Sequence, residues 1–150
     1  MGSDKFAYKL RWLERLRAYL GTHVAADRAA VLCGDFNVAP AALDVWDERV
    51  WEGSVLCTPQ EREALGRAIG ASAMTDLVRA HHPNDQIFTW WDYRQLAFAK
   101  NRGLRIDHIF VTAPLVPRVK SVTVDRSTRK GAQPSDHAAV VVEIDLALAS

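Results

Sequence analysis

Two short polar clusters contain the residue types of a hydrolytic site. Asp35 and Asn37 lie two residues apart directly after an apolar run, and Asp136 and His137 directly precede another. A carboxylate can bind a hard cation or polarise water, and an amide can hold a water molecule or a phosphoryl oxygen. Histidine titrates near neutral pH, so it can transfer a proton or hydrogen-bond to an oxyanion. These side chains together suit phosphodiester hydrolysis.

A third carboxylate, Asp107, interrupts an apolar alternation between Ile106 and His108. An aspartate in a central strand is unfavourable and needs a partner if it is buried. Arg105 is the obvious partner on the same face, so a structural ion pair is the alternative to a catalytic role. The other two clusters have plain alternatives as well, because Asp and Asn favour turns and an isolated Asp-His pair is often structural.

A basic, aromatic segment lies between the clusters. Residues 86–130 carry nine Lys or Arg against three Asp or Glu, whereas residues 1–85 carry ten against twelve. The same segment contains five aromatic residues, Phe88, Trp90, Trp91, Tyr93 and Phe98. Basic side chains contact phosphates and aromatic rings stack on bases or sugars, so this composition indicates nucleic-acid binding. The alternative is a solvated surface beside an ordinary aromatic core.

The elements that must position these clusters follow from apolar spacing. Leucines three and four residues apart predict a helix with one buried stripe over residues 4–20, ending near Gly21. The continuous apolar run over residues 29–33 predicts a strand covered on both faces. Thr58, followed by proline and then glutamate three residues after it, predicts a helix start, with the helix running towards Gly70.

The remaining elements are a short helix and four strands. A helix is predicted over residues 75–80, and strands are predicted over residues 87–92, 104–112, 119–124 and 138–144. In the second strand, alternation places Ile106, His108 and Phe110 on one face. This element order predicts an α/β protein in which each polar cluster lies at a strand end.

Composition limits the class of protein further. The 150 residues are enough for one domain, and 49% hydrophobic with 25% charged residues is ordinary for a globular protein. Disorder and a membrane-spanning helix are therefore not expected, and the first residues lack a signal-peptide pattern. The two cysteines, Cys33 and Cys57, are expected to be reduced, which favours a cytoplasmic protein.

The motifs resemble those of the exonuclease III family, DNA-repair nucleases of the endonuclease/exonuclease/phosphatase superfamily. Two motifs are shared across the superfamily: the Gly-Asp-Phe-Asn string at residues 34–37 and the Pro-Ser-Asp-His string at residues 134–137. Two more are typical of the bacterial branch: Phe-Thr-Trp-Trp-Asp-Tyr-Arg at residues 88–94 and Asn-Arg-Gly-Leu-Arg-Ile-Asp at residues 101–107. The likeness runs from about Lys5 to Ile144.

The resemblance implies roles for particular residues. It implies that Asp35, Asn37, Asp107 and His137 are catalytic, Asp107 near the leaving group and His137 on the phosphate. It implies metal binding by Asp35, Asn37, Asp136 and His137. It also implies DNA contacts from Trp90, Arg94, Arg102 and Arg105. The expected cofactor is Mg²⁺, with Mn²⁺ able to substitute, and the expected partner is double-stranded DNA with abasic sites or 3′ ends.

The resemblance also implies an architecture that is only part of the family's. Family members fold as a four-layer α/β/β/α sandwich, as in deoxyribonuclease I, and this sequence is similar to the second half. Residues 1–150 are therefore expected to form the C-terminal half, with a mainly antiparallel or mixed sheet and helices on one face. The family's first half supplies an Asn, the principal metal-binding Glu and a catalytic Tyr, which have no counterpart here.

Two consequences are expected from that difference. The chain alone should hydrolyse DNA weakly or not at all, and its exposed sheet face could support a homodimer. A non-catalytic DNA-binding or interaction module derived from the same fold is the alternative function. Another superfamily activity, such as that of a sphingomyelinase or an inositol-phosphate phosphatase, is disfavoured by Trp90 and by the string around Arg105.

Overall fold

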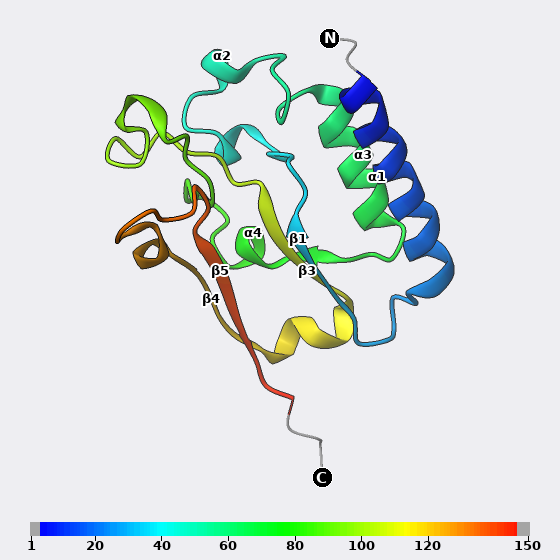
Figure 1. Cartoon of the computed structure of the whole chain (residues 1–150). Coiled ribbons are helices and arrows are strands. Elements are labelled where there is room, and N and C mark those ends of the chain that lie inside the picture. Colours follow the sequence, from blue (N-terminus) through cyan, green and yellow to red (C-terminus); the bar gives the residue numbers. More distant parts are fainter. Residues whose placement is uncertain (1–3, 147–150) are drawn as a thin grey trace.

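The computed structural model describes residues 4–146, in which helices cover a small antiparallel sheet and a β-hairpin lies beside it (Figure 1). The helices are α1 (Asp4–His23), α2 (Glu48–Trp51), α3 (Pro59–Gly70) and α4 (Leu77–His81). The strands are β1 (Val31–Asp35), β2 (Thr75–Asp76), β3 (Asp107–Val111), β4 (Val119–Asp125) and β5 (Ala139–Ile144). The predicted α/β class is confirmed.

The first sheet has the order β1-β3-β2, and both of its pairings are antiparallel. In the β1–β3 register, Cys33 lies opposite Ile109 and Asp35 lies opposite Asp107. The prediction that the first strand is covered on both faces is wrong. Alternate side chains of β1 point away from the helices onto an open face, and Val31 is 51% exposed.

Helices α1 and α3 pack together on the other face of this sheet. Leu13 of α1, Leu65 and Ile69 of α3, and Phe110 of β3 share one buried cluster. The predicted start of α3 is confirmed, because the Thr58 side chain accepts a hydrogen bond from the Glu61 backbone N–H. Helix α1 ends at His23, past the predicted stop at Gly21.

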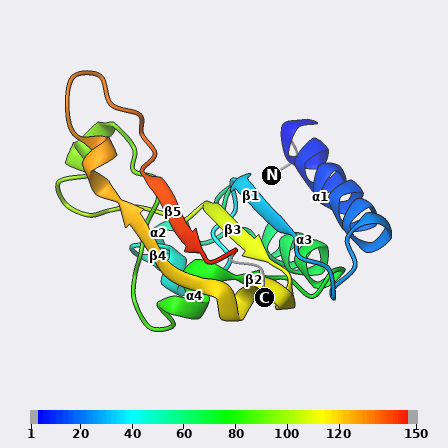
Figure 2. The same ribbon diagram turned by 90° about the horizontal axis from the view of Figure 1, so that it is seen from below.

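The β4–β5 hairpin is antiparallel and follows the predicted strand ranges closely. Val122 of β4 packs with Leu77 and Val78 of α4 and with Val111 of β3, which joins the hairpin to the sheet. Seen from below, β5 lies between β4 and β3 (Figure 2). The loop that enters β5 is thereby brought to the ends of β1 and β3.

The predicted strand over residues 87–92 is not regular. Trp90 instead makes isolated antiparallel bridges to Leu104 on one side and to His137 on the other. Gly103 permits this close approach, since a Cβ there would lie 2.5 Å from the Trp91 Nε1 atom and 2.8 Å from the Trp90 carbonyl. Residues 88–92 therefore connect the Leu104 run to the loop that carries His137.

Two further expectations concern the membrane and the cysteines. Among residues 4–146, no helix combines the length and the apolar character needed to cross a bilayer. Cys33 and Cys57 are both free, as predicted. Burial raises the pKa of the Cys57 thiol to about 11, so Cys57 behaves as a core residue.

Candidate functional site

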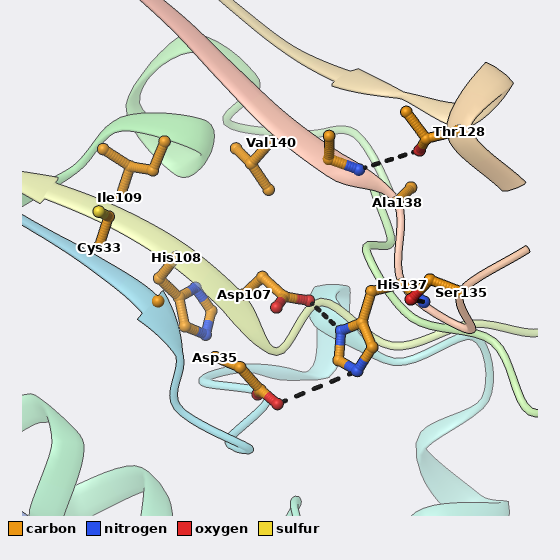
Figure 3. Close-up of a pocket in the computed structure, with 12 residues that line it drawn as sticks. Cys33, Asp35, Asp107, His108, Ile109, Thr128, Ser135, His137, Ala138 and Val140 are labelled. Carbon is orange, nitrogen blue, oxygen red and sulfur yellow. Dashed lines mark hydrogen bonds and ion pairs between the residues drawn. The ribbon is translucent and has the colours of Figure 1, made fainter.

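Asp35 and Asp107 form the centre of the candidate site, at the ends of β1 and β3 (Figure 3). They are direct cross-strand partners, and the neighbouring pair is joined by a hydrogen bond from the Phe36 N–H to the Ile106 carbonyl. Because such bonds alternate in an antiparallel ladder, the two aspartates form a non-hydrogen-bonded pair, whose side chains lie closest. Two carboxylates are thus held together on the open face of the sheet.

His137 approaches this pair from the loop before β5. Its Nδ1 lies 2.9 Å from Asp107 Oδ2, and its Nε2 lies 4.0 Å from Asp35 Oδ2 (Figure 3). An ionised carboxylate can only accept a hydrogen bond, so Nδ1 carries the proton and donates it to Asp107. The Nε2 atom is left facing Asp35 and the hollow beside it.

Asn37 orients Asp35. The Asn37 backbone N–H donates to Asp35 Oδ1 at 2.8 Å, and its side-chain amide donates to Oδ2 at 3.0 Å. This arrangement requires a left-handed backbone at Asn37, with φ 52°, which asparagine tolerates better than most residues. The predicted pair is therefore brought together, with the amide holding the carboxylate in place.

The ionisation of Asp35 is perturbed by this environment. Burial raises the pKa of the Asp35 carboxyl, and the neighbouring Asp107 charge raises it further. The Asn37 hydrogen bonds and His137 act in the opposite direction without cancelling the shift. Holding two like charges on adjacent strands has a cost in stability, which is common where a site serves function.

Asp136 lies beside the cluster and has a different partner. Its Oδ2 accepts a hydrogen bond of 2.9 Å from Trp90 Nε1, and its Oδ1 lies 3.9 Å from His137 Nε2. Asp136 thus links the carboxylate–imidazole cluster to the aromatic segment.

Three residues that the sequence reasoning missed hold the cluster in position. Buried Thr89 accepts hydrogen bonds on its Oγ1 from the backbone N–H groups of Ile106 and Asp107, each at 3.1 Å. Tyr93 donates its hydroxyl to the Pro134 carbonyl at 2.7 Å, and Arg129 donates to the Ser135 carbonyl. Thr89 thereby fixes the start of β3, while Tyr93 and Arg129 fix the loop that carries His137.

Arg105 does not face this site. Its side chain is 1% exposed and bonds to Asp44 Oδ1 at 2.7 Å and to Asp76 Oδ2 at 2.7 Å. The prediction that Arg105 contacts DNA is therefore wrong, and so is the alternative pairing with Asp107. Because β3 begins only at Asp107, strand alternation does not place residue 105 on the face of Asp107.

This second cluster is a buried ion network. Arg79 also bonds to Asp44, at 2.5 Å, so two guanidinium groups neutralise the fully buried carboxylate. Burial opposes the charged form of Asp44, but Arg105 and Arg79 outweigh it and lower the pKa of that carboxyl. His108 joins this network through a hydrogen bond between its Nδ1 and the Arg105 guanidinium. Burial, together with the positive charge of Arg105, lowers the pKa of His108 to about 4.

A separate hollow of about 300 Å³ contains three predicted DNA contacts, Trp90, Arg94 and Arg102. Two residues outside the prediction join them. The Trp51 ring meets Trp90 edge-on at 6.3 Å between centroids, and the Arg102 guanidinium lies 5.0 Å from the centroid of the Trp46 ring. Trp46 and Trp51 come from a stretch without regular periodicity, so only their residue type could have indicated a role.

Comparison with known proteins agrees with this geometry. The model of the endonuclease/exonuclease/phosphatase family matches residues 1–137. The chain belongs to this family. Exodeoxyribonuclease III of Haemophilus influenzae is 33% identical over 147 residues, which cover 93% of this chain and 54% of that protein.

Two solved structures of family members superpose closely. An AP endonuclease from Archaeoglobus fulgidus matches with a TM-score of 0.91 and 37% identity, covering 96% of this chain and 56% of that one. A 3′ phosphatase from Neisseria, bound to a product DNA hairpin, matches with a TM-score of 0.90 and 38% identity, covering 95% and 55%. The chain thus spans about half the length of these relatives, and the predicted half of a deoxyribonuclease I-like sandwich is confirmed.

The residues present fit a divalent cation. Asp35, Asp107 and His137 each offer a ligand atom, and these atoms lie within 4.8 Å of one another. Two carboxylates supply the oxygen ligands that Mg²⁺ and Mn²⁺ accept, with few protein ligands needed beside water. Asp35 and His137 were predicted as metal ligands, whereas Asp136, also predicted, lies bonded to Trp90.

Proposed function

We propose that the carboxylate–imidazole cluster is part of a metal-dependent DNA phosphodiesterase site that acts in base-excision repair. The proposed substrate is double-stranded DNA at abasic sites and 3′ ends. Relatives named exodeoxyribonuclease III and AP endonuclease support the reaction class. The observation that carries the proposal is the convergence of Asp35, Asp107 and His137 from three separate segments on one open face.

Each residue has a distinct part in the proposed reaction. Asp35, held by Asn37, orients the attacking water and accepts its proton. His137, held by Asp107 through Nδ1, would in its doubly protonated form donate its Nε2–H to a phosphoryl oxygen and stabilise the charge that develops there. Asp107 is proposed to lie near the leaving oxygen and to orient the group that protonates it. A bound divalent cation would offset the phosphate charge.

We further propose that residues 1–150 form the C-terminal half of such a domain and that the isolated chain is weakly active or inactive. Two carboxylates and one imidazole form a sparse ligand set, so Mg²⁺ affinity should be low. The free thiols of Cys33 and Cys57 support a reducing, cytoplasmic compartment.

A cleavage assay tests this proposal. Purified chain is incubated with Mg²⁺ or Mn²⁺ and an abasic-site duplex, and both nicking and 3′-end removal are measured. We expect slow, metal-dependent cleavage at most, lost in His137→Ala and Asp35→Asn. Rapid cleavage by the chain alone would contradict the proposed incompleteness, and residual cleavage that both substitutions leave unchanged would contradict the site.

The hollow with Trp46, Trp51 and Trp90 favours a second candidate, a non-catalytic DNA-binding module. Two arginines, Arg94 and Arg102, are among the residues that line this hollow, and Asp35, Asp107 and His137 are not among them. The two functions differ in one result. Salt-sensitive DNA binding that Arg102→Ala weakens, without any cleavage for His137→Ala to remove, favours the module.

A further inference from the structure

The segment that follows β1 is held by side chains that contact its backbone carbonyls. Residues 37–39 lie past the end of β1, and each of their three carbonyl oxygens contacts a side-chain nitrogen from a different element. These contacts join Lys9 of α1 to the Asn37 carbonyl, His108 of β3 to the Val38 carbonyl and Arg62 of α3 to the Ala39 carbonyl. The turn beside Asp35 is therefore fixed by three elements at once.

Donor chemistry shows that all three contacts are hydrogen bonds to the carbonyls. Lysine and arginine side chains carry only donors. The Arg105 guanidinium also donates to His108 Nδ1 at 3.1 Å, so the hydrogen of the neutral imidazole lies on Nε2. His108 Nε2 then donates to the Val38 carbonyl at 2.8 Å, and Arg62 Nε donates to the Ala39 carbonyl at 3.0 Å. These side chains satisfy carbonyls that lie outside the β1–β3 ladder.

Lys9 differs from the other two donors because it acts on the residue that orients Asp35. The Asn37 backbone N–H and side-chain amide both donate to the Asp35 carboxylate. Asn37 is also a residue with a left-handed backbone, φ 52°, a conformation that persists where the surrounding structure enforces it. The Lys9 ammonium on the Asn37 carbonyl limits rotation of the peptide plane that leaves this residue.

The Lys9 ammonium is itself held in place by a buried carboxylate. Lys9 Nζ lies 2.5 Å from Glu61 Oε1, and the Glu61 side chain is fully buried, whereas that of Lys9 is 16% exposed. The Thr58 hydroxyl donates to Glu61 Oε2 at 2.6 Å, and the backbone N–H of Leu56 donates to the same atom at 3.1 Å. The capping carboxylate of α3 therefore positions the ammonium of α1, the helix that lies alongside it (Figure 1).

We propose that Lys9 is a positioning residue of the candidate site and acts on Asp35 through Asn37. The contacts run from the α3 cap through the Lys9 ammonium to the Asn37 carbonyl, and from the Asn37 N–H and amide to the Asp35 carboxylate. Lys9 thereby keeps Asp35 directed towards Asp107 and His137. The link from Lys9 to Asn37 concerns the chain alone, and only its importance for the reaction rests on the proposed function.

Hydrogen exchange and Mn²⁺ binding of the 150-residue chain test this role. Lys9→Met nearly keeps the length of the side chain but removes the ammonium, so the Asn37 turn should open more often. We expect the Asn37 backbone amide to exchange about fivefold or more faster in NMR, because one charge-assisted hydrogen bond no longer holds the turn. For the same reason, the Mn²⁺ dissociation constant, measured by paramagnetic broadening, should rise about fivefold or more.

Thr58→Ala is the matched control. It removes a hydrogen bond to Glu61 and weakens the cap of α3, but it does not alter the contact of Lys9 with the Asn37 carbonyl. We expect it to lower stability in urea unfolding without changing Asn37 exchange or Mn²⁺ affinity.

Lys9→Gln is a second variant that decides the question if Lys9→Met does not fold. Its amide can still donate to the charged Glu61, which is a better acceptor than a neutral carbonyl. The side chain is shorter than that of lysine and does not reach both acceptors, so the exchange of the Asn37 amide should again accelerate.

Three results would overturn the proposal: unchanged Asn37 exchange in the Lys9 variants, equal acceleration in Thr58→Ala, or faster exchange with unchanged Mn²⁺ affinity. Failure of the proposed function gives a different result. An original chain that binds no Mn²⁺ would contradict the metal-dependent site, and Asn37 exchange would still decide the role of Lys9. Unchanged exchange and unchanged Mn²⁺ affinity in the Lys9 variants would overturn that role and leave the site standing.

Discussion

Two clusters of aspartate and histidine lie near the start of β3, and only the buried one also contains arginine, so they differ in how their charges are balanced. In the buried network, Arg105 and Arg79 neutralise Asp44, and Asp76 pairs with Arg105. In the open cluster, three carboxylates of Asp35, Asp107 and Asp136 surround the single imidazole of His137.

The difference separates stability from function. A buried carboxylate persists only when cations and hydrogen bonds compensate for its lost hydration, and the Asp44 network provides both. The open cluster keeps an excess of negative charge that solvent tolerates and that an added cation could neutralise. Aspartates paired with arginines therefore support the fold at one place, and aspartates without them leave a binding site at the other.

The largest expected effect is on the buried network. Arg105→Met should lower the free energy of unfolding by about 3–5 kcal/mol, because it leaves the Asp44 carboxylate short of compensation. The exposed Arg102 is the matched control, and Arg102→Met should change stability by less than about 0.5 kcal/mol while weakening DNA binding. Urea unfolding of the two variants measures the stability changes. Equal stabilities for the two variants would break the distinction between the clusters.

A smaller effect on stability is expected at Thr89, whose hydroxyl holds the backbone at the start of β3. Thr89→Val keeps the shape of the side chain but removes the acceptor for two backbone N–H groups, so stability should fall by about 1–3 kcal/mol. Thr89→Ser keeps the hydroxyl and is the control. Urea unfolding of both variants measures the difference, and a Val variant as stable as the Ser variant would refute the positioning role of Thr89.

Acid should act mainly through the buried network. The lowered pKa of Asp44 means that its stabilisation is present above the ordinary aspartate pKa and is lost as pH falls through the folded value. The folded pKa of His108, about 4, lies below its ordinary 6.5, so stability also falls as pH drops between these values. Unfolding free energies from pH 7 to pH 3 should decrease, and less steeply in His108→Gln. The same pH dependence of the unfolding free energy in the original chain and in His108→Gln would contradict the contribution assigned to His108.

The smallest expected effect is at Asp35, where the pH dependence of stability has the opposite sign. The raised pKa of Asp35 means that the folded state binds its proton more tightly, so stability is lost as pH rises from the ordinary aspartate pKa through the folded value. Asp35→Asn should therefore stabilise the chain at neutral pH, by less than about 1 kcal/mol, and this gain should vanish in acid. Thermal unfolding at both pH values provides the check, and destabilisation at pH 7 would count against the cost assigned to this site.

The sequence predicted the elements better than it predicted the partners of individual side chains. Local signals such as the Thr58 cap and the leucine spacing of α1 depend on neighbouring residues, and these predictions are confirmed within a few residues. The convergence of Asp35, Asp107 and His137 was anticipated because the motif strings resembled a known family. Their mutual distances depend on the β1–β3 register, which composition does not reveal.

Arg105 shows why the remainder could not be predicted. Its neighbours in sequence suggested a pair with Asp107, but its partners come from residues 61 and 29 positions away. The same holds for Thr89, whose two donors belong to another segment. The openness of β1 was hidden as well, because an apolar run reads the same whether both of its faces are covered or only one.

The most direct test of the central claim, that the open cluster and not the buried one takes a divalent cation, is paramagnetic broadening by Mn²⁺ in NMR spectra of the chain. We expect that the amides of Asp35, Asp107 and His137 broaden first and that Asp35→Asn combined with Asp107→Asn abolishes the broadening. Mg²⁺ in excess should reverse it. Broadening centred on Asp44 and Asp76, or broadening that survives both substitutions, would show that the open cluster is not where the cation binds.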